Sequence, residues 1–253
     1  MTIEIVTVPC RTDNYAFLVH TGGQTALVDA PEAAPISAEL DRRGWSLEEI
    51  WLTHHHGDHT EAVEELKAEY GATVTGAAAD AHRLPPLDRA VEDGESFDFD
   101  GHTVEVIDVS GHTIGHIALH LPDATAAFTA DSLMALGCGR VFEGTFGQMW
   151  DSLSKLAALP AETTIYSGHE YTEANGRFAL TIEPDNPDLI SRVDAVAAAR
   201  AAGMPTVPSQ LSEELATNPF LRAVRPEVKA SIGLPNATDA EAFAEIRKRK
   251  DRF

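Results

Sequence analysis

The chain has 253 residues, of which 43% are hydrophobic, and it carries a formal net charge of −21. That length allows one large domain, or one domain with a smaller addition, around a sizeable core. The negative charge repels phosphate backbones and so argues against a nucleic-acid partner. No apolar run reaches the ~20 residues that a membrane span needs.

The N-terminus and the cysteines indicate the cellular setting. The segment 1–6 lacks basic residues and already alternates like a strand, so we expect no signal peptide and a cytoplasmic location. Cys10 and Cys138 form neither a disulfide framework nor a CxxC pattern. We expect a soluble protein without a membrane partner, and we expect it to be a monomer.

Short apolar strands separated by turn residues dominate the first two-thirds of the chain. Strands are predicted at 3–8, 16–20, 25–29, 50–53, 73–75, 103–109, 117–121, 126–129 and 163–166. Helices are predicted at 34–43, 60–70 and 148–159, and a hairpin at 93–109. This mixture indicates a layered α/β architecture rather than a doubly wound repeat.

From about residue 171 the strand signals end and helical patterns follow. Helices are predicted at 173–182, 187–202, 209–215 and 239–250, and the Pro-rich stretch 204–208 separates two of them. Thr238 with Glu241 three residues later is a capping box, which predicts a helix start at that point. We expect a domain boundary near residue 170.

The segment THHHGDH at 53–59 carries the strongest chemical signal. On an extended backbone His54 and His56 point to one side and His55 to the other. A turn at Gly57 then brings the next two residues, Asp58 and His59, back beside them. Three imidazoles and a carboxylate suit zinc or a similar divalent ion. The alternative for the carboxylate is a simple helix N-cap.

Two metal ions need more ligands than this motif supplies. Candidates are His112, Asp131 and His169, because each follows an apolar strand, where loops carry functional side chains. Taken singly, each could equally be a capping or solvated residue. We assign no role to His55 or to the remaining histidines.

Together these motifs resemble the metallo-β-lactamase superfamily and, within it, the glyoxalase II (hydroxyacylglutathione hydrolase) family. The resemblance covers nearly the whole chain. The segments GCGR at 137–140, GHEYT at 168–172 and KDRF at 250–253 are more specific than the first motif. The resemblance implies a four-layer αββα catalytic domain at 1–170 and a mostly helical substrate-binding domain at 171–253.

The resemblance also implies roles for individual residues. It assigns one metal ion to His54, His56 and His112, a second to Asp58, His59 and His169, and the bridge between them to Asp131. Asp58 and Asp131 are thereby implied to be catalytic. Zinc is the expected metal, with iron or manganese as alternatives. Glutathione contacts are implied for Arg140, Tyr171, Arg247 and Lys250, whereas Phe142 stands where many members have tyrosine.

The implied reaction is hydrolysis of S-(2-hydroxyacyl)glutathione, such as S-lactoylglutathione, by a metal-bridged hydroxide. This is the second step of methylglyoxal detoxification. Alternatives with the same metal motif are a lactonase, a β-lactamase, an iron-dependent persulfide dioxygenase and a tRNA-processing nuclease. The helical segment with its basic end disfavours the first three, and the net charge disfavours the last. A metal-binding scaffold without catalysis is the non-enzyme alternative.

Overall fold

The computed structural model describes residues 3–253, so Met1 and Thr2, which belong to the segment that argues against a signal peptide, lie outside the described residues. The chain forms two compact units. The first runs up to Asp108 and includes Ile114–Thr129, and the second comprises Val109–Thr113 and Ala130–Phe253. The predicted domain boundary near residue 170 stays a prediction.

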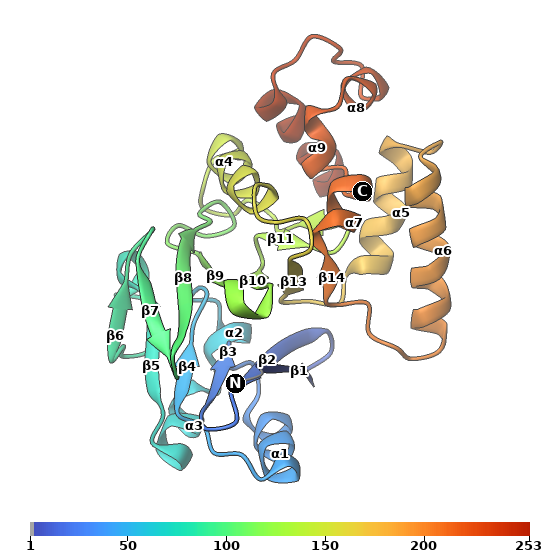
Figure 1. The fold of residues 1–253 in the computed structure, drawn as a ribbon. Helices are drawn as coiled ribbons and strands as arrows, with labels where there is room; N and C mark the ends of the chain where they lie inside the picture. The colour runs from blue at the N-terminus through green and yellow to red at the C-terminus, as the bar shows by residue number, and fades with distance from the viewer. Residues whose placement is uncertain (1–2) are drawn as a thin grey trace. The chain divides into compact units, whose positions relative to one another are not determined.

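A mixed sheet forms one layer of the first unit (Figure 1). Its strands, in order across the sheet, are β1 (Glu4–Cys10), β2 (Asn14–His20), β3 (Thr25–Val28), β4 (Glu49–Trp51), β5 (Thr73–Ala77) and β6 (Arg89–Val91). The first three pair antiparallel, and β3 to β6 pair parallel. The predicted strands are confirmed with small shifts at their ends, whereas β6 was not predicted because its three residues are mostly exposed.

Two helices cover the outer face of this sheet. Ile36 and Leu40 of α1 (Ala33–Arg43) and Leu66 of α3 (Val63–Tyr70) lie in one buried cluster with Leu27 and Ile50 of the sheet. Burial of such side chains contributes about 1.5–3 kcal/mol each.

The predicted helix 60–70 is interrupted at residues 61–62, because the chain breaks there into α2 (Gly57–Thr60) and α3. The backbone of Ala30 causes the break. Its N–H donates to the carbonyl of His59, and its carbonyl accepts from the N–H of Ala62. These bonds use backbone groups that a continuous helix would need for its own ladder.

An antiparallel sheet faces the first one. It contains β7 (Ser96–Phe99), β8 (His102–Asp108), β9 (Ile117–Leu121) and β10 (Ala126–Ala130), paired in that order. The predicted hairpin 93–109 is thus confirmed. The Trp51 ring of β4 meets Phe97 and Phe99 edge-on, with ring centroids 5.5 and 5.0 Å apart. The two sheets therefore pack as a sandwich with an aromatic core.

The second unit is mostly helical. Its helices are α4 (Phe146–Ala157), α5 (Thr172–Ile182), α6 (Pro187–Ala201), α7 (Leu211–Thr217), α8 (Pro226–Ser231) and α9 (Asp239–Arg252). Its short strands are β11 (Leu133–Met134), β12 (Gly137–Cys138), β13 (Thr164–Ser167) and β14 (Ser209–Gln210). The expectation of no strand after residue 171 was wrong, because β14 pairs with β13. Within residues 3–253, none of the helices is long and apolar enough to cross a membrane.

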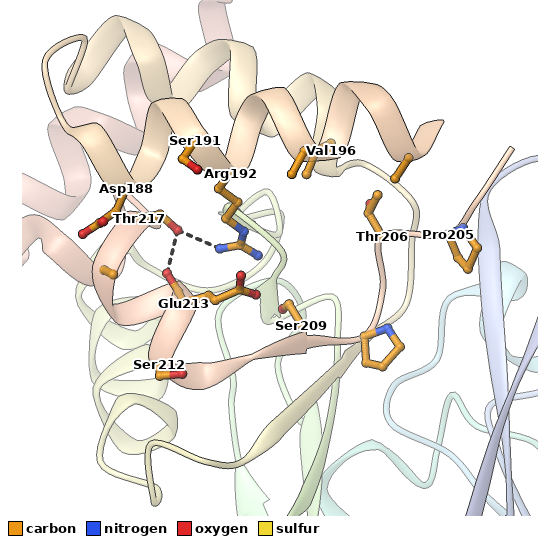
Figure 2. Close-up of a pocket in the computed structure, with 14 residues that line it drawn as sticks. Asp188, Ser191, Arg192, Val196, Pro205, Thr206, Ser209, Ser212, Glu213 and Thr217 are labelled. Carbon is orange, nitrogen blue, oxygen red and sulfur yellow. Dashed lines mark hydrogen bonds between the residues drawn. The ribbon is translucent and has the colours of Figure 1, made fainter. Parts of the chain in front are cut away.

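A buried ion pair joins α6 to α7. Arg192 donates through Nη1 to Thr217 Oγ1 at 2.7 Å and pairs through Nη2 with Glu214. Figure 2 shows Arg192 extending from α6 into a cavity that both helices line, with its bond to Thr217 dashed. Glu214 is fully buried. Removing either charge alone would leave the other buried and uncompensated.

Both cysteines are buried, one in each unit. Burial, together with the nearby Glu32 carboxylate, raises the pKa of Cys10 to about 12. Burial also raises the pKa of Cys138 to about 11, although Arg247 partly opposes the effect. Neither thiol is ionised near neutral pH.

The predicted capping box of α9 is present and supports a stability prediction. Thr238 Oγ1 accepts from the Glu241 N–H at 3.3 Å, and Glu241 Oε2 accepts from the Thr238 N–H at 2.8 Å. We expect Thr238→Ala to lower the free energy of unfolding by about 0.5–2 kcal/mol. Urea denaturation measures the loss, and Thr238→Ser, which keeps the hydroxyl, is the control. Equal stability of both variants would contradict this role of the cap.

Candidate metal centre

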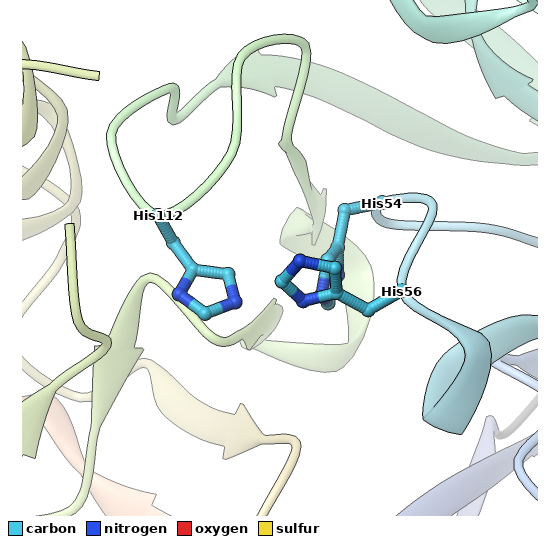
Figure 3. Close-up of side chains that lie close together, drawn as sticks. All are labelled: His54, His56 and His112. Carbon is cyan, nitrogen blue, oxygen red and sulfur yellow. The ribbon is translucent and has the colours of Figure 1, made fainter. Parts of the chain in front are cut away.

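Four ligand-type residues of the first unit form the first ligand group: His54, His56, Asp58 and His59. The two that follow β4, His54 and His56, extend from one loop (Figure 3). His54 Nε2 and His56 Nδ1 lie 3.2 Å apart, and two nitrogens on one tetrahedral zinc lie about 3.3 Å apart. His59 Nε2 lies 3.8 Å from Asp58 Oδ2. The spacing of the first pair therefore fits two ligands of a single ion.

The buried carboxylate of Asp29 fixes the orientation of this group. Asp29 Oδ1 accepts from the Thr53 N–H, and Oδ2 accepts from Thr53 Oγ1 and His59 Nδ1, at 2.9, 2.9 and 2.8 Å. Because the only hydroxyl proton of Thr53 goes to Asp29, its oxygen accepts from His54 Nδ1 at 3.0 Å. The lone pairs of His54 and His59 are thus carried on Nε2. No sequence pattern marked Asp29, which only ended a predicted strand.

The adjacent histidine, His55, faces a different partner. Its Nδ1 donates to Asp80 Oδ2 at 2.9 Å, and the buried Asp80 also pairs with Arg83. Asn14, from β2, donates through Nδ2 to Asp58 Oδ2 at 3.1 Å and to the Asp58 carbonyl at 3.0 Å. Asp80 and Asn14 were also missed by sequence reasoning, because each approaches the motif from a distant segment.

Three ligand-type residues of the second unit form the second ligand group: His112, Asp131 and His169. They come from three separate loops, and each is at least 94% buried. Asp131 Oδ2 lies 3.4 Å from His112 Nε2 and 3.4 Å from His169 Nε2. His112 Nδ1 donates to the Arg140 carbonyl at 2.8 Å, so its lone pair is also on Nε2. One carboxylate oxygen therefore lies between two imidazoles at ligand–ligand spacing.

Both ligand groups have the donor chemistry that a divalent ion requires. Imidazole nitrogens and carboxylate oxygens suit zinc, iron and manganese. In each group a hydrogen bond donated by Nδ1 holds an imidazole in the tautomer that presents Nε2, as is usual for metal-bound histidines. The residues present therefore fit metal binding.

A basic cluster, defined as Arg140, Arg177, Arg247 and Lys250, lies within the second unit. Arg247 is only 5% exposed and donates through Nη1 to the Cys138 carbonyl at 2.9 Å. Asp251 Oδ1 lies 2.9 Å from Arg247 Nη2 and 3.4 Å from Arg140 Nε. The carboxylate of Asp251 thus lies between two of the residues for which the resemblance implied glutathione contacts.

Lys250 is half-buried, and its Nζ donates to the Ala174 carbonyl at 3.2 Å. The ammonium also lies 5.3 Å from the ring centroids of Phe178 and Phe253. Burial, followed by the charges of Arg247 and Arg177, lowers the pKa of Lys250 to about 8. Lys250 is therefore a cation whose charge depends on pH in the weakly alkaline range.

Two aromatic residues border the second ligand group. The Tyr171 ring stacks on the His169 ring with centroids 4.7 Å apart, and Tyr171 is 40% exposed. Phe142, in the position where many relatives were expected to carry tyrosine, is 61% exposed, and its ring centroid lies 5.3 Å from that of His112. Phe142 offers an apolar surface but no hydroxyl.

Comparisons with known proteins define the class first. Residues 11–169 match the metallo-beta-lactamase superfamily. Solved structures with the same fold include ETHE1 from Myxococcus xanthus, with a TM-score of 0.69 and 23% identity, covering 98% of this chain and 90% of that one. Another is TTHA1623 in a di-iron-bound form, with a TM-score of 0.63 and 24% identity, covering 85% of this chain and 98% of that one. The predicted fold class is confirmed.

Residues 170–253 match the family described as hydroxyacylglutathione hydrolase C-terminus. A hydroxyacylglutathione hydrolase from Roseobacter denitrificans is 65% identical over the full length of both chains. The chain therefore belongs to the hydroxyacylglutathione hydrolase family. The predicted resemblance is thereby confirmed, and membership of this superfamily implies binding of divalent metal ions.

The environment of Lys250 supports a titration prediction. We expect its ammonium to lose the proton with a midpoint near pH 8, against an ordinary value of about 10.4. The charge is thus present below pH 8 and lost above it. NMR titration of the Lys250 side chain measures the midpoint, with the signal assigned by its loss in Lys250→Arg. Arg177→Gln should raise the midpoint, and an ordinary midpoint in the native chain would contradict the prediction.

Proposed function

We propose that the chain hydrolyses S-(2-hydroxyacyl)glutathione to a 2-hydroxy acid and glutathione. The observation that carries the proposal is the Asp131 carboxylate oxygen at 3.4 Å from two imidazoles, in a chain that matches the hydroxyacylglutathione hydrolase family along its length. S-Lactoylglutathione is the proposed substrate, and methylglyoxal detoxification is the proposed setting. We further propose that the protein is a cytoplasmic monomer and has no nucleic-acid or membrane partner.

The two ligand groups are proposed to act together. In this proposal His54, His56 and His112 hold one divalent ion, Asp58, His59 and His169 hold a second, and Asp131 bridges them. Zinc is the proposed metal, with iron and manganese as alternatives that the donor set also suits. When bound, two such ions supply a water molecule acidic enough to attack near neutral pH and a Lewis acid for the carbonyl oxygen.

The residues of the chain then have distinct tasks. Asp58 and Asp131 compensate positive charge and fix the geometry of the centre, while Asp29 and the Arg140 carbonyl hold imidazoles in the tautomer that presents Nε2. No side chain needs to protonate the leaving group, because a thiol has a pKa of about 8.5 and leaves readily as thiolate. This chemistry favours a thioester over an amide substrate.

The basic cluster is proposed to bind the glutathione part. Arg140 and Lys250 supply charge-assisted hydrogen bonds to carboxylates, and Tyr171, which is 40% exposed, adds a hydroxyl. Arg247 is proposed to contribute mainly through its charge, because its donors already bond Cys138 and Asp251. Against a net charge of −21, such a local positive group favours an anionic ligand.

The alternative is another reaction on the same fold, such as a lactonase or an iron-dependent persulfide dioxygenase. The similarity to ETHE1 at 23% identity supports the fold alone. The match of residues 170–253 to the hydroxyacylglutathione hydrolase C-terminus favours the thioester hydrolase.

The proposal predicts thioesterase activity that depends on two metal ions per chain. Turnover of S-lactoylglutathione, combined with elemental analysis of the same sample, measures both. We expect Asp131→Ala to keep its fold but to lose about 100-fold or more in kcat, because about an ångström of misplacement alone has that effect. Full activity with one metal ion, or near-native turnover of the folded variant, would refute the bridging role.

The basic cluster predicts a selective loss of affinity. Losing one charge-assisted hydrogen bond costs about 1.5–3 kcal/mol, so Lys250→Ala should raise KM for S-lactoylglutathione roughly 10- to 100-fold. Its kcat should change little if the contact is equally strong in the ground and transition states. Steady-state kinetics with that substrate and with a small thioester lacking the peptide measure the difference.

The matched control is Lys248→Ala, which removes an exposed cation from the same helix. Lys250 is the better test position than Arg247, because Arg247→Ala also breaks the bond to Cys138. Equal losses of Lys250→Ala on both substrates would argue against a glutathione contact.

A further inference from the structure

The hairpin formed by β11, its turn and β12, residues 133–138, is buried along its whole length. Its turn residue Leu136 has a left-handed backbone with φ of 55°, which is unfavourable for a residue with a branched side chain. A buried turn leaves backbone N–H and C=O groups that need partners other than water. The conformation of this hairpin therefore depends on the groups that form hydrogen bonds with its backbone.

Polar side chains from the C-terminal part of the chain supply those partners. Glu214 Oε2 accepts from the Leu136 N–H at 2.9 Å. Asn218 Nδ2 donates to the carbonyls of Met134 and Gly137 at 3.1 and 2.9 Å. The orientation of the Asn218 amide is fixed by its other end, since its Oδ1 accepts from the Phe220 N–H at 3.0 Å.

Further hydrogen bonds to the hairpin come from other side chains of the second unit. Asn175 of α5 donates through Nδ2 to the Ala135 carbonyl at 3.1 Å, and Arg247 of α9 reaches the Cys138 carbonyl. Asn218 Nδ2 also lies 3.1 Å from Glu214 Oε2, and Glu214 is neutralised by Arg192. The turn is thus held by a connected, buried polar network, which is stabilising when its members are satisfied.

The hairpin in turn adjoins the second ligand group. The N–H of Gly139 donates to the Ser132 carbonyl at 3.1 Å. A Cβ at Gly139 would lie 1.9 Å from the Asp131 carbonyl oxygen and 3.0 Å from His112 Nδ1, so the backbone passes these residues without spare room. The next carbonyl, of Arg140, accepts from His112 Nδ1. A shift of the hairpin would therefore move both Asp131 and the group that orients His112.

We propose that Asn218, supported by Glu214 and Arg192, is a positioning residue for the metal ligands Asp131 and His112. The inference rests on the metal centre proposed above. It gives the C-terminal helical region a second task besides substrate binding: its side chains set the geometry of a ligand group that precedes it in sequence. Partners that orient metal ligands in this way typically affect metal affinity about 10- to 100-fold.

The test is Asn218→Asp, which keeps the size of the side chain but removes both N–H donors. We expect metal affinity, measured by competition with a chromophoric chelator, to fall about 10- to 100-fold. The absorption spectrum of the cobalt-substituted protein should change with the ligand geometry. In steady-state assays kcat should fall while KM for the glutathione thioester stays, because the basic cluster keeps its residues.

Asn186→Asp is the matched control within the same unit. It makes the same chemical change and keeps the carbonyl-type oxygen that caps α6 at the N–H groups of Asp188 and Leu189. Its Nδ2 bonds Ala216 rather than the hairpin, so metal affinity and cobalt spectrum should stay native. Should Asn218→Asp not fold, Asn175→Ala, which removes one bond to the same turn, takes its place with the same expectations.

The outcomes separate the two proposals. If the native chain binds no divalent ion, the metal centre is wrong and the positioning role is lost with it. If the native chain binds metal and the folded hairpin variant binds it equally tightly with an unchanged cobalt spectrum, the positioning role alone is overturned. Weakened binding in the hairpin variant, with native binding in Asn186→Asp, supports it.

Discussion

The first ligand group depends on one buried carboxylate. Asp29 accepts hydrogen bonds from Thr53 at the start of the segment 53–59 and from His59 at its end, so a single side chain fixes both ends of the motif. Its own backbone is left-handed, with φ of 57°, a conformation that persists only when the surroundings hold it. Because the carboxylate accepts hydrogen bonds from Thr53 Oγ1 and His59 Nδ1, it also determines, directly for His59 and through Thr53 for His54, which imidazole nitrogen carries the lone pair. Asp29 thus determines both the geometry of the motif and the tautomers of its imidazoles.

Much of the fold could be predicted because its signals are local. Alternation and turn residues located β9 at its observed bounds, and the capping box located the start of α9. The ligand-type residues after strands could be recognised for a similar reason: a polar histidine or aspartate directly after an apolar strand contrasts with its surroundings. All three of these residues, His112, Asp131 and His169, lie in the second unit, where their side chains meet.

The remaining features depend on contacts between distant segments, which leave no periodic signal. The break between α2 and α3 arises from the backbone of Ala30, and the pairing of Asp251 with Arg140 arises from tertiary packing. Asn218 illustrates the same limit. Its segment marks the family resemblance, yet nothing in the segment shows that its amide bonds Met134 and Gly137, more than 80 residues earlier in the chain.

The two buried cysteines have a practical consequence. Alkylation requires the thiolate to attack the reagent, and both thiols are buried with a raised pKa, so labelling requires the surrounding structure to open. Cys10 belongs to the first unit and Cys138 to the second. The native sequence therefore has one cysteine in each unit whose labelling rate measures local opening. Comparing the two rates shows whether the units open together or one before the other.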